Sequence, residues 1–553
     1  MQKNGSEIIM EVLLEQGVDT VFGYPGGTVL NIYDALYKYQ DKIQHVLTSH
    51  EQGAAHAADG YARASGKVGV CIATSGPGAT NLVTGLATAY MDSVPVVAIT
   101  GNVPTSLLGR DSFQEVDIAG VTMPITKHNY IVKDVTKLAD TLRSAFRIAN
   151  SGRKGPVLVD VPKDVSALMC EYEPKAKIQP DPMPKLRHYK IETAAKYINA
   201  AERPMIYMGG GIVAAGAQEE IVKFAEKLQI PVASSSMGLG GFPCDHDLFT
   251  GMIGMHGTYM SNKAVDDSDV LIVVGARFSD RVAGNRTGFA KNSKIIHIDL
   301  DSAELNKNVN VDLYITGDIK EALSALIELT DEVKSRPWTQ EVKKYDTAKP
   351  MTTGGIGVNP QKVIETISKM NSAESIMVTD VGQHQMWTAQ YYNFRKPRTF
   401  ISSGGLGTMG YGMGAAIGSQ FSNPDKRVVL ITGDGSFHMN LNELATVVSY
   451  DLPVVIVVMN NSVLGMVRQW QKIFYGNRFA ATDPHRKTDF VKLADAFGIK
   501  GMRINNDDEI ESVLKEAFAY GKGVLVECIV SPDCNVLPMI PPGGSVTDTV
   551  DEM

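Results

Sequence analysis

Residues 427–467, RVVLITGDGSFHMNLNELATVVSYDLPVVIVVMNNSVLGMV, constrain the fold of this chain more than any other segment. Two short apolar runs, residues 428–432 and 453–459, have the length and composition of buried parallel strands. Between them the sequence predicts a glycine-rich turn at residues 433–436 and a helix over residues 442–450. Strand, turn, helix and strand in this order make a right-handed crossover in a parallel sheet.

Two polar residues follow these strands and are the first candidates for a binding site. Asp434 comes after the first strand and Asn461 comes after the second. Because the carboxyl ends of parallel strands meet at the same edge of a sheet, we expect the two side chains to lie close together. One carboxylate and one amide suit Mg²⁺, which takes its other ligands from phosphate and water. For an isolated GDG sequence, the plain alternative is a turn that binds nothing.

The phosphate that such a metal would share is not held by a P-loop. The nearest match, residues 60–67, has one residue too many between its glycines, and Val68 follows where the motif has Ser or Thr. The metal and a helix N-terminus must therefore neutralise the anion.

Length and composition exclude several classes of protein. At 553 residues the chain is too long for a single core, and its 44% hydrophobic and 21% charged residues are typical of globular domains. A net charge of −8 gives no reason to expect nucleic acid, and no apolar run is long enough to span a membrane. Five cysteines without a CxxC pair predict reduced thiols and a cytoplasmic location. The opening MQKNGSEIIMEVLLEQG predicts an amphipathic helix, not a signal or transit peptide.

Strand-like and helical segments alternate along the whole chain, which predicts α/β domains with doubly wound parallel sheets. Further strands are expected at residues 68–74, 95–100, 156–161, 204–208, 270–274, 294–298, 375–379 and 523–530. Two segments without periodicity, residues 171–187 and 345–357, are expected to be linkers. The expected domains are therefore residues 1–170, 188–344 and 358–553.

A series of motifs runs along nearly the full chain: VFGYPGG, HEQGAAHAADGYAR, TSGPGATN, FQEVD, TKHN, GARFSDRV, VGQHQMW, GGLGTMG, and GDGSF followed by the Asn pair. In this order they resemble the large, catalytic subunits of acetohydroxyacid synthase, or acetolactate synthase, a family of thiamine-diphosphate enzymes. The resemblance implies a pyrimidine-binding domain first, a central FAD-binding domain, and a last domain that binds the diphosphate. Thiamine diphosphate, Mg²⁺ and FAD are the implied cofactors.

The resemblance assigns residues of the first and last domains to thiamine diphosphate. Glu51 would hydrogen-bond the pyrimidine N1′ and favour its imino tautomer in a largely dry site, although an isolated Glu is more often a solvated surface residue. Met409 would hold the two cofactor rings in a V shape, and Val463 would offer its carbonyl to Mg²⁺ beside Asp434 and Asn461. Further contacts are implied for Gly26, Gly27, Gln383, His384, Gly407, Gly435, Ser436 and Met466.

The resemblance also assigns residues to the substrates and to FAD. Phe113, Gln114 and Lys127 would lie around the active site and its entry, and Trp470 would favour 2-ketobutyrate as second substrate. Arg277 would face the second substrate's carboxylate, which suits a bidentate guanidinium. FAD contacts are implied for Gly210, Gly211, His256, Gly275, Arg277, Asp299 and Asp318. From the residues alone, a nucleotide fold that binds nothing is equally consistent with the central domain.

The implied reaction is the decarboxylative condensation of pyruvate with pyruvate or 2-ketobutyrate. Its products are 2-acetolactate and 2-aceto-2-hydroxybutyrate, in branched-chain amino-acid biosynthesis. A homo-oligomer with active sites at the subunit interface is implied, and a small regulatory subunit is a further candidate partner. The alternatives are an FAD-independent catabolic acetolactate synthase, a pyruvate oxidase, and a non-catalytic nucleotide-binding protein. Trp470 and RFSDRV favour the biosynthetic enzyme, and Glu51 argues against a protein that only binds.

Overall fold

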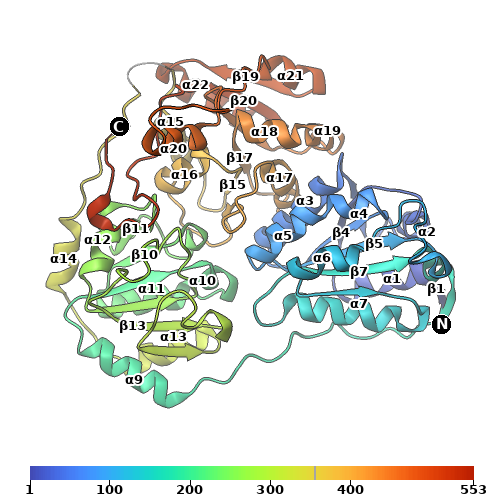
Figure 1. The fold of residues 1–553 in the computed structure, drawn as a ribbon, viewed down its shortest axis with the longest axis horizontal. Helices are drawn as coiled ribbons and strands as arrows, with labels where there is room; N and C mark the ends of the chain where they lie inside the picture. Colours follow the sequence, from blue (N-terminus) through green and yellow to red (C-terminus); the bar gives the residue numbers. More distant parts are fainter. Residues whose placement is uncertain (354–356, 553) are drawn as a thin grey trace.

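The computed structural model describes residues 1–353 and 357–552. Residues 354–356, which belong to the second expected linker, and Met553 lie outside the described residues. Three six-stranded sheets follow one another along the described chain, and every strand pair within them is parallel. Figure 1 shows the three sheets with helices packed around each of them. The predicted fold class, doubly wound α/β domains, is confirmed.

The N-terminal sheet has the strand order β3-β2-β4-β5-β7-β6. Its order reverses between β2 and β4, and such a switch point opens a crevice at the carboxyl ends of the strands, where α/β domains bind ligands. Its strands are β2 (Thr20–Gly23), β3 (Gln44–Leu47), β4 (Gly69–Ala73), β5 (Val96–Asn102), β6 (His128–Ile131) and β7 (Val157–Pro162). Its helices are α1 (Gly5–Glu15), α2 (Leu30–Lys38), α3 (Glu51–Ser65), α4 (Pro77–Asn81), α5 (Val83–Met91), α6 (Ile118–Thr122), α7 (Val135–Asn150) and α8 (Lys163–Ala167).

The start of the chain is only partly the helix that the sequence predicts. Helix α1 begins at Gly5, where Asn4 and Glu7 form a capping box. The residues before it form β1 (Gln2–Asn4), which pairs antiparallel with β8 (Met169–Glu171). The end of the N-terminal domain is thereby tied back to its beginning.

The C-terminal sheet repeats the topology of the N-terminal one. Its order is β16-β15-β17-β18-β20-β19, so that both sheets read 2-1-3-4-6-5 when strands are counted along the chain. The strands are β15 (Ile376–Thr379), β16 (Phe400–Ile401), β17 (Val428–Gly433), β18 (Val455–Asn460), β19 (Lys500–Ile504) and β20 (Val524–Ile529). The helices are α15 (Pro360–Met370), α16 (Gln383–Tyr391), α17 (Tyr411–Ser422), α18 (Asp434–Asn440), α19 (Leu444–Ser449), α20 (Gly465–Phe474), α21 (Phe490–Phe497) and α22 (Ile510–Ala519).

The expected turn at residues 433–436 is wrong, and so is the single helix over residues 442–450. Strand β17 runs to Gly433 and helix α18 starts directly at Asp434. A carboxylate in the first turn stabilises the positive end of a helix, which allows the helix to begin without a loop. After Asn440 the chain tightens into a 3₁₀ turn, Leu441–Glu443, before α19 begins.

The central sheet has the order β11-β10-β9-β12-β13-β14. Counted along the chain this is 3-2-1-4-5-6, the order of dinucleotide-binding α/β folds, with its switch point between β9 and β12. The strands are β9 (Pro204–Met208), β10 (Val232–Ser234), β11 (Phe249–Met252), β12 (Val270–Val274), β13 (Lys294–Asp299) and β14 (Leu313–Thr316). The helices are α9 (His188–Asn199), α10 (Gly210–Ala215), α11 (Gln218–Leu228), α12 (Tyr259–Asp267), α13 (Ile319–Leu329) and α14 (Pro337–Lys343).

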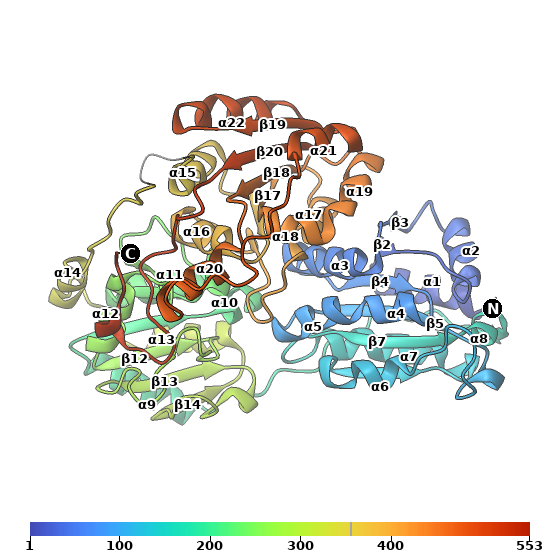
Figure 2. The same ribbon diagram turned by 45° about the horizontal axis from the view of Figure 1, so that its top comes forward.

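The N-terminal and C-terminal domains share one hydrophobic core, which contains residues of both sheets. Helices α3 and α17 lie against each other at its centre, as Figure 2 shows. Their backbones approach closely because a Cβ on Gly60 would lie 2.3 Å from the carbonyl oxygen of Ala415, and one on Gly418 would lie 1.8 Å from that of Ala57. Glycine is therefore required at both positions.

Two extended segments connect the central domain to the others. The chain between β8 and α9 carries no helix or strand and crosses the molecule as a single thread (Figure 1). At the other end, the chain after β20 returns to the central domain, where the Ile540 N–H donates to the Met255 carbonyl at 2.8 Å. Within the described residues, no helix is long and apolar enough to cross a membrane.

Candidate functional site

Glu51 lies in the crevice of the N-terminal sheet. It is the first residue of α3, directly after β3 and the N-cap residue His50, and only 8% of its surface is exposed. Its Oε2 accepts a hydrogen bond from the Asn81 side chain at 2.9 Å. A Cβ on Gly78 would lie 3.1 Å from its other oxygen. The carboxylate is therefore held in a largely dry position, as the resemblance predicts.

The same crevice contains three other predicted residues. Gly26 follows β2 and packs so tightly on Thr74 that a Cβ would lie 2.4 Å from the threonine side chain, while Gly27 has open space around it. Gln114 has a left-handed backbone with φ of 58°, and its carbonyl oxygen lies 2.7 Å from where a Cβ on Gly76 would be. The structure thus brings Gly26 and Gln114 to the switch point that Glu51 borders.

Phe113 and Lys127 have different surroundings. Phe113 is 87% exposed at the rim of this crevice. Lys127 immediately precedes β6, so it lies at the amino edge of the parallel sheet, opposite to Glu51. Its Nζ donates to the carbonyls of Ile148 and Ser151, at 2.5 and 2.6 Å, where α7 ends. Burial among these groups lowers its pKa to about 8. Its role at the entry of the site stays a prediction.

Asp434 and Asn461 meet at the carboxyl edge of the C-terminal sheet, as their places after β17 and β18 require. The Asn461 N–H is among the backbone donors to the Asp434 carboxylate. Asn461 also donates to Gln383 Oε1 at 3.1 Å and accepts from the Val463 N–H at 3.2 Å. Burial raises the pKa of Asp434 to about 6, because a dry site disfavours the charged carboxylate, and a bound cation would stabilise that charge.

The neighbouring groups fit a diphosphate. His384 is buried on α16, and its Nε2 has no hydrogen-bond partner among the described residues. Burial lowers the pKa of its imidazole to about 3, so the ring is a neutral hydrogen-bonding group. Gly382 and Gly433 leave room for this ring, since a Cβ on either would lie within 2.9 Å of it. Ser436 stands in the first turn of α18, whose free N–H groups favour an anion, and its hydroxyl donates to the Val381 carbonyl.

Met409 belongs to a glycine-rich loop between β16 and α17. Gly407 and Gly410 have φ of 70° and 86°, so the loop takes turns that other residues adopt only with strain. A Cβ on Gly435 would lie 3.8 Å from the end of the Met409 side chain, which places Met409 beside α18. Buried Asp380 accepts from the Gly410 N–H at 2.7 Å and fixes the end of the loop.

Sequence reasoning missed Asp380 and also Glu443 and Asn81. Glu443 is fully buried, and both its oxygens accept from the Ser49 N–H, next to Glu51. An acid directly after the apolar run SIMVT was a usable signal for Asp380, because polar groups at strand ends point into the crevice. Asn81 is the last residue of the motif TSGPGATN. Nothing in the sequence distinguishes Glu443 from an ordinary helical acid.

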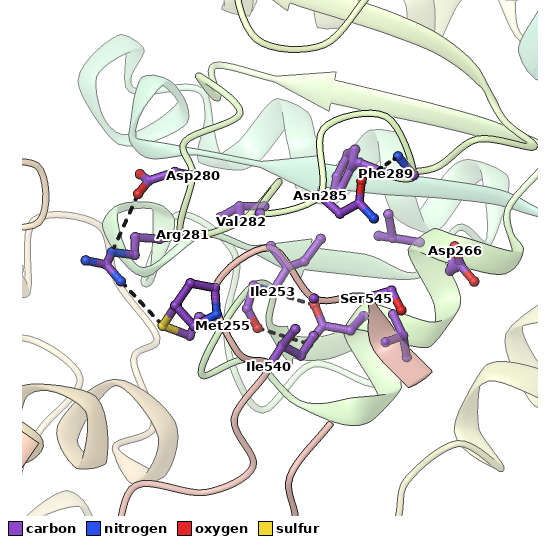
Figure 3. Close-up of a pocket in the computed structure, with 18 of the residues that line it drawn as sticks. Ile253, Met255, Asp266, Asp280, Arg281, Val282, Asn285, Phe289, Ile540 and Ser545 are labelled. Atoms are coloured by element: carbon purple, nitrogen blue, oxygen red, sulfur yellow. Dashed lines mark hydrogen bonds and ion pairs between the residues drawn. The ribbon is translucent and has the colours of Figure 1, made fainter. Parts of the chain in front are cut away.

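Trp470 lies on α20, turned toward the central domain. The Arg281 guanidinium lies 5.5 Å from its ring centroid, and its indole N–H is buried without a partner among the described residues. Met466, on the same helix, packs against the C-terminal core. Figure 3 shows the cavity next to Arg281, which the C-terminal segment closes with Ile540 and Ser545.

The central domain's predicted residues lie at or after the carboxyl ends of its strands, and the glycines lie at the switch point. Gly211 and Gly275 pack backbone to backbone, and a Cβ on Gly211 would lie 2.5 Å from the Gly275 Cα. Gly210 starts α10 directly after β9. His256 Nδ1 is buried without a partner among the described residues, a position open to a ligand. Asp299 is the last residue of β13, and burial raises the pKa of its carboxyl to about 6.

Two residues predicted to bind FAD make hydrogen bonds to other parts of the chain. Asp318 caps α13 by accepting from the N–H groups of Lys320 and Glu321. Arg277 donates to the Met91 carbonyl on α5 at 2.7 Å, and so joins the central domain to the N-terminal one. Their ligand roles stay predictions.

Comparisons with known proteins agree with this arrangement. Residues 3–121, 191–326 and 380–528 match the N-terminal TPP binding, central and C-terminal TPP binding domains of thiamine pyrophosphate enzymes. The "Probable acetolactate synthase large subunit" of Methanocaldococcus jannaschii is 48% identical, covering 99% of this chain and 95% of the relative. The "Acetolactate synthase isozyme 3 large subunit" of Escherichia coli is 42% identical, with 99% and 98% covered. The "Acetolactate synthase large subunit" of Porphyra purpurea is 44% identical, covering 98% of this chain and 95% of the relative. The chain belongs to the acetolactate synthase large-subunit family.

Membership in this thiamine pyrophosphate enzyme family accounts for the repeated topology. The N-terminal and C-terminal family domains overlap with the two sheets of identical strand order. In this acetolactate synthase family member, each of those sheets carries one half of the predicted thiamine diphosphate site. Among the described residues, no hydrogen bond joins Glu51 in one crevice to Asp434 or Met409 in the other.

Proposed function

We propose that this chain is the catalytic subunit of an acetolactate synthase. It condenses pyruvate with pyruvate or 2-ketobutyrate, with loss of CO₂, in branched-chain amino-acid biosynthesis. The observation that carries the proposal is the dry, hydrogen-bonded position of Glu51 in a chain that matches acetolactate synthase large subunits over nearly its full length. A protein that only bound a nucleotide would not need this carboxyl.

The proposed roles fall to two crevices, one for the pyrimidine ring and one for the metal and the diphosphate. Bound thiamine diphosphate would supply the electron sink for decarboxylation. Glu51 holds a proton at the pyrimidine N1′ in its dry crevice, where the proton's position responds to the ring. Asp434, Asn461 and the Val463 carbonyl would hold Mg²⁺, and Gln383 and His384 would orient the diphosphate. Met409 would support thiamine diphosphate from its loop, and Trp470 and Phe113 would exclude water from the substrates.

FAD is the third cofactor we propose. The support is the 3-2-1-4-5-6 strand order of the central sheet, its glycines at the switch point, and the unpartnered ring nitrogen of His256. Asp299 at a strand end is of the residue type that hydrogen-bonds a ribose. We assign the flavin a structural role, because net oxidation is not part of the proposed condensation.

A second copy of the chain completes each active site in this proposal. Phe113, Val121 and Met123 are 87%, 43% and 68% exposed in the crossover from β5 to β6, and Met439 is 54% exposed next to Gly410 in the C-terminal domain. Apolar side chains gathered around a site that one chain leaves incomplete favour a homo-oligomer. The relatives are named large subunits, which supports a smaller regulatory partner as well.

Charges placed in this surface should dissociate the oligomer. We expect the double substitution Val121→Glu and Met123→Glu to give monomers in size-exclusion chromatography with light scattering, with turnover reduced at least a hundredfold. The interface would have to desolvate an unpaired carboxylate, which costs several kcal/mol and so prevents association. Met183→Glu, which changes an exposed methionine of the first linker, is the matched control and should leave both properties unchanged. An active monomeric double variant would refute the shared site.

The function is tested by pyruvate turnover of the purified chain with thiamine diphosphate and Mg²⁺, with and without FAD. Acetolactate formed only with FAD supports the biosynthetic synthase. Acetolactate formed regardless of FAD indicates the catabolic enzyme, and acetyl phosphate with flavin reduction indicates a pyruvate oxidase. Absence of any product, also after addition of a small subunit, would overturn the assignment.

A further inference from the structure

The loop that carries Met409 is exposed where it begins. Gly404 to Gly407 are exposed, whereas Thr408 and Gly410 are buried. An exposed segment with three glycines among four residues has many conformations of similar energy, so its path must be fixed by contacts from outside. The proposed role of Met409 requires the loop to hold that side chain against the cofactor.

Asp92 of the N-terminal domain supplies the contact at the exposed end. It follows α5 and accepts hydrogen bonds from two consecutive N–H groups, Gly404 to Oδ2 at 3.0 Å and Gly405 to Oδ1 at 2.7 Å. The carboxylate sits so close that a Cβ on Gly405 would lie 2.6 Å from it. Bonds from N–H groups to an ionised acceptor are stronger than neutral ones.

The carboxylate of Asp92 is itself held in place. Only 1% of its side chain is exposed, and the Arg63 guanidinium donates to its Oδ2 at 2.9 Å. Arg63 also bonds buried Asp59 at 2.6 Å and the Ser402 carbonyl at 3.0 Å. Asp59 in turn accepts from the Tyr411 hydroxyl, which follows the loop directly. The network therefore binds the chain on both sides of the loop, at Ser402 before it and at Tyr411 after it.

A second contact comes from the same helix. The hydroxyl groups of Thr88 on α5 and Thr408 in the loop lie 2.8 Å apart, and both are buried. Thr408 precedes Met409, so α5 contacts the loop at its start and immediately before the proposed cofactor contact. Together with Asp380 at Gly410, these groups leave Met409 little freedom of position.

We propose that Asp92 is a positioning residue for the reaction, which fixes the Met409 loop from the N-terminal domain and so holds Met409 against thiamine diphosphate. The inference rests on the proposed function. It predicts that loss of the Asp92 carboxylate frees the loop first and slows chemistry as a consequence. Misplacement of a group by about 1 Å is enough to lower a rate by about a hundredfold.

Asp92→Asn is the informative substitution, since its amide has nearly the same size but replaces one acceptor oxygen by a donor. The chain contains a matched control. Asp269 accepts from the consecutive N–H groups of Glu202 and Arg203, at 2.8 and 3.0 Å, in the central domain. Asp269→Asn therefore removes the same kind of contact away from the Met409 loop. Thr88→Val is a second, milder variant should Asp92→Asn fail to fold.

Two measurements separate positioning from general damage. In the cofactor-free protein, amide hydrogen exchange of residues 403–412 should rise at least tenfold in Asp92→Asn and stay unchanged in Asp269→Asn. In the loaded enzyme, kcat and the exchange rate of the thiazolium C2 proton with D₂O should fall together by roughly tenfold to a hundredfold, with KM for pyruvate within about threefold. Thr88→Val should show the same pattern at roughly twofold to tenfold.

Unchanged loop exchange in Asp92→Asn, or a kcat equal to that of Asp269→Asn, would overturn the inference. Loss of turnover with equal exchange across the whole chain would overturn it too, because it would indicate loss of stability. If the wild-type chain forms no acetolactate, also after addition of a small subunit, the proposed function fails. The exchange of residues 403–412 and the dissociation constant for thiamine diphosphate still decide whether Asp92 fixes the loop.

Discussion

Glu51→Gln should lower pyruvate turnover by a factor of about 10² to 10⁴, the usual contribution of a positioned acid–base group. Glutamine keeps the shape and can still accept from Asn81, but it cannot pass a proton to and from the cofactor ring. Thiamine diphosphate should still bind within about threefold of the wild-type affinity, because the diphosphate and the metal are held in the other crevice. Steady-state kinetics and calorimetric titration measure the two quantities separately.

A suitable control for Glu51→Gln is Glu219→Gln, which also removes an acid from the first turn of a helix, α11. Loss of such a charge costs only about 0.3–1 kcal/mol of stability through the helix dipole. Glu219→Gln should therefore lose a similar amount of stability and none of the turnover. Glu51→Gln with turnover above a tenth of the wild type would exclude the proposed proton role.

The second large effect is expected at Asp434. Asp434→Asn should weaken the binding of thiamine diphosphate with Mg²⁺ at least a hundredfold, because the site loses the negative charge that Mg²⁺ requires. Without cofactor the same variant should be more stable than the wild type at neutral pH. Burial raises the pKa of Asp434 from 3.8 to about 6, so the folded chain binds its proton more tightly than the unfolded chain. Stability therefore falls as pH rises from about 4 to 6, by at most about 3 kcal/mol.

The pH dependence of metal binding follows from the same shift. Below pH 6 the proton on Asp434 competes with Mg²⁺, and the wild-type affinity should fall by up to about tenfold per pH unit. Thermal shift between pH 5 and 8, with and without Mg²⁺ and thiamine diphosphate, tests both predictions. Asp489→Asn, at the N-cap of α21, is the control and should leave the metal affinity unchanged at every pH. A pH-independent affinity would show that Asp434 is not a ligand.

The proximity of Asp434 and Asn461 followed from the sequence because one geometric rule determines it. Both residues end buried parallel strands joined by one crossover, and such ends always share an edge. The start of α18 did not follow, since a GDG sequence is common in turns and carries no signal that the strand continues directly into a helix.

The contacts between domains could not be predicted from the sequence, for a different reason. Helix α3 is buried on nearly every side, so its composition predicts burial but does not identify α17 as its partner. Asp92 and Glu443 act across the same boundary on backbone N–H groups, which carry no sequence signal. For Lys127 the sequence motif identifies the residue but does not show on which edge of the sheet it lies.

The shared core of the first and last domains has a consequence for the way the chain is made. Helix α3 ends at Ser65, while its partner α17 begins at Tyr411 and the last strand of the common core lies near residue 525. At synthesis rates of about 5–20 residues per second, the ribosome completes that partner only on the order of tens of seconds later. Until then the nascent domain exposes the alanine- and glycine-rich face of α3 that α17 covers in the folded chain. Chaperones that bind apolar segments during translation should therefore engage this protein early and release it late.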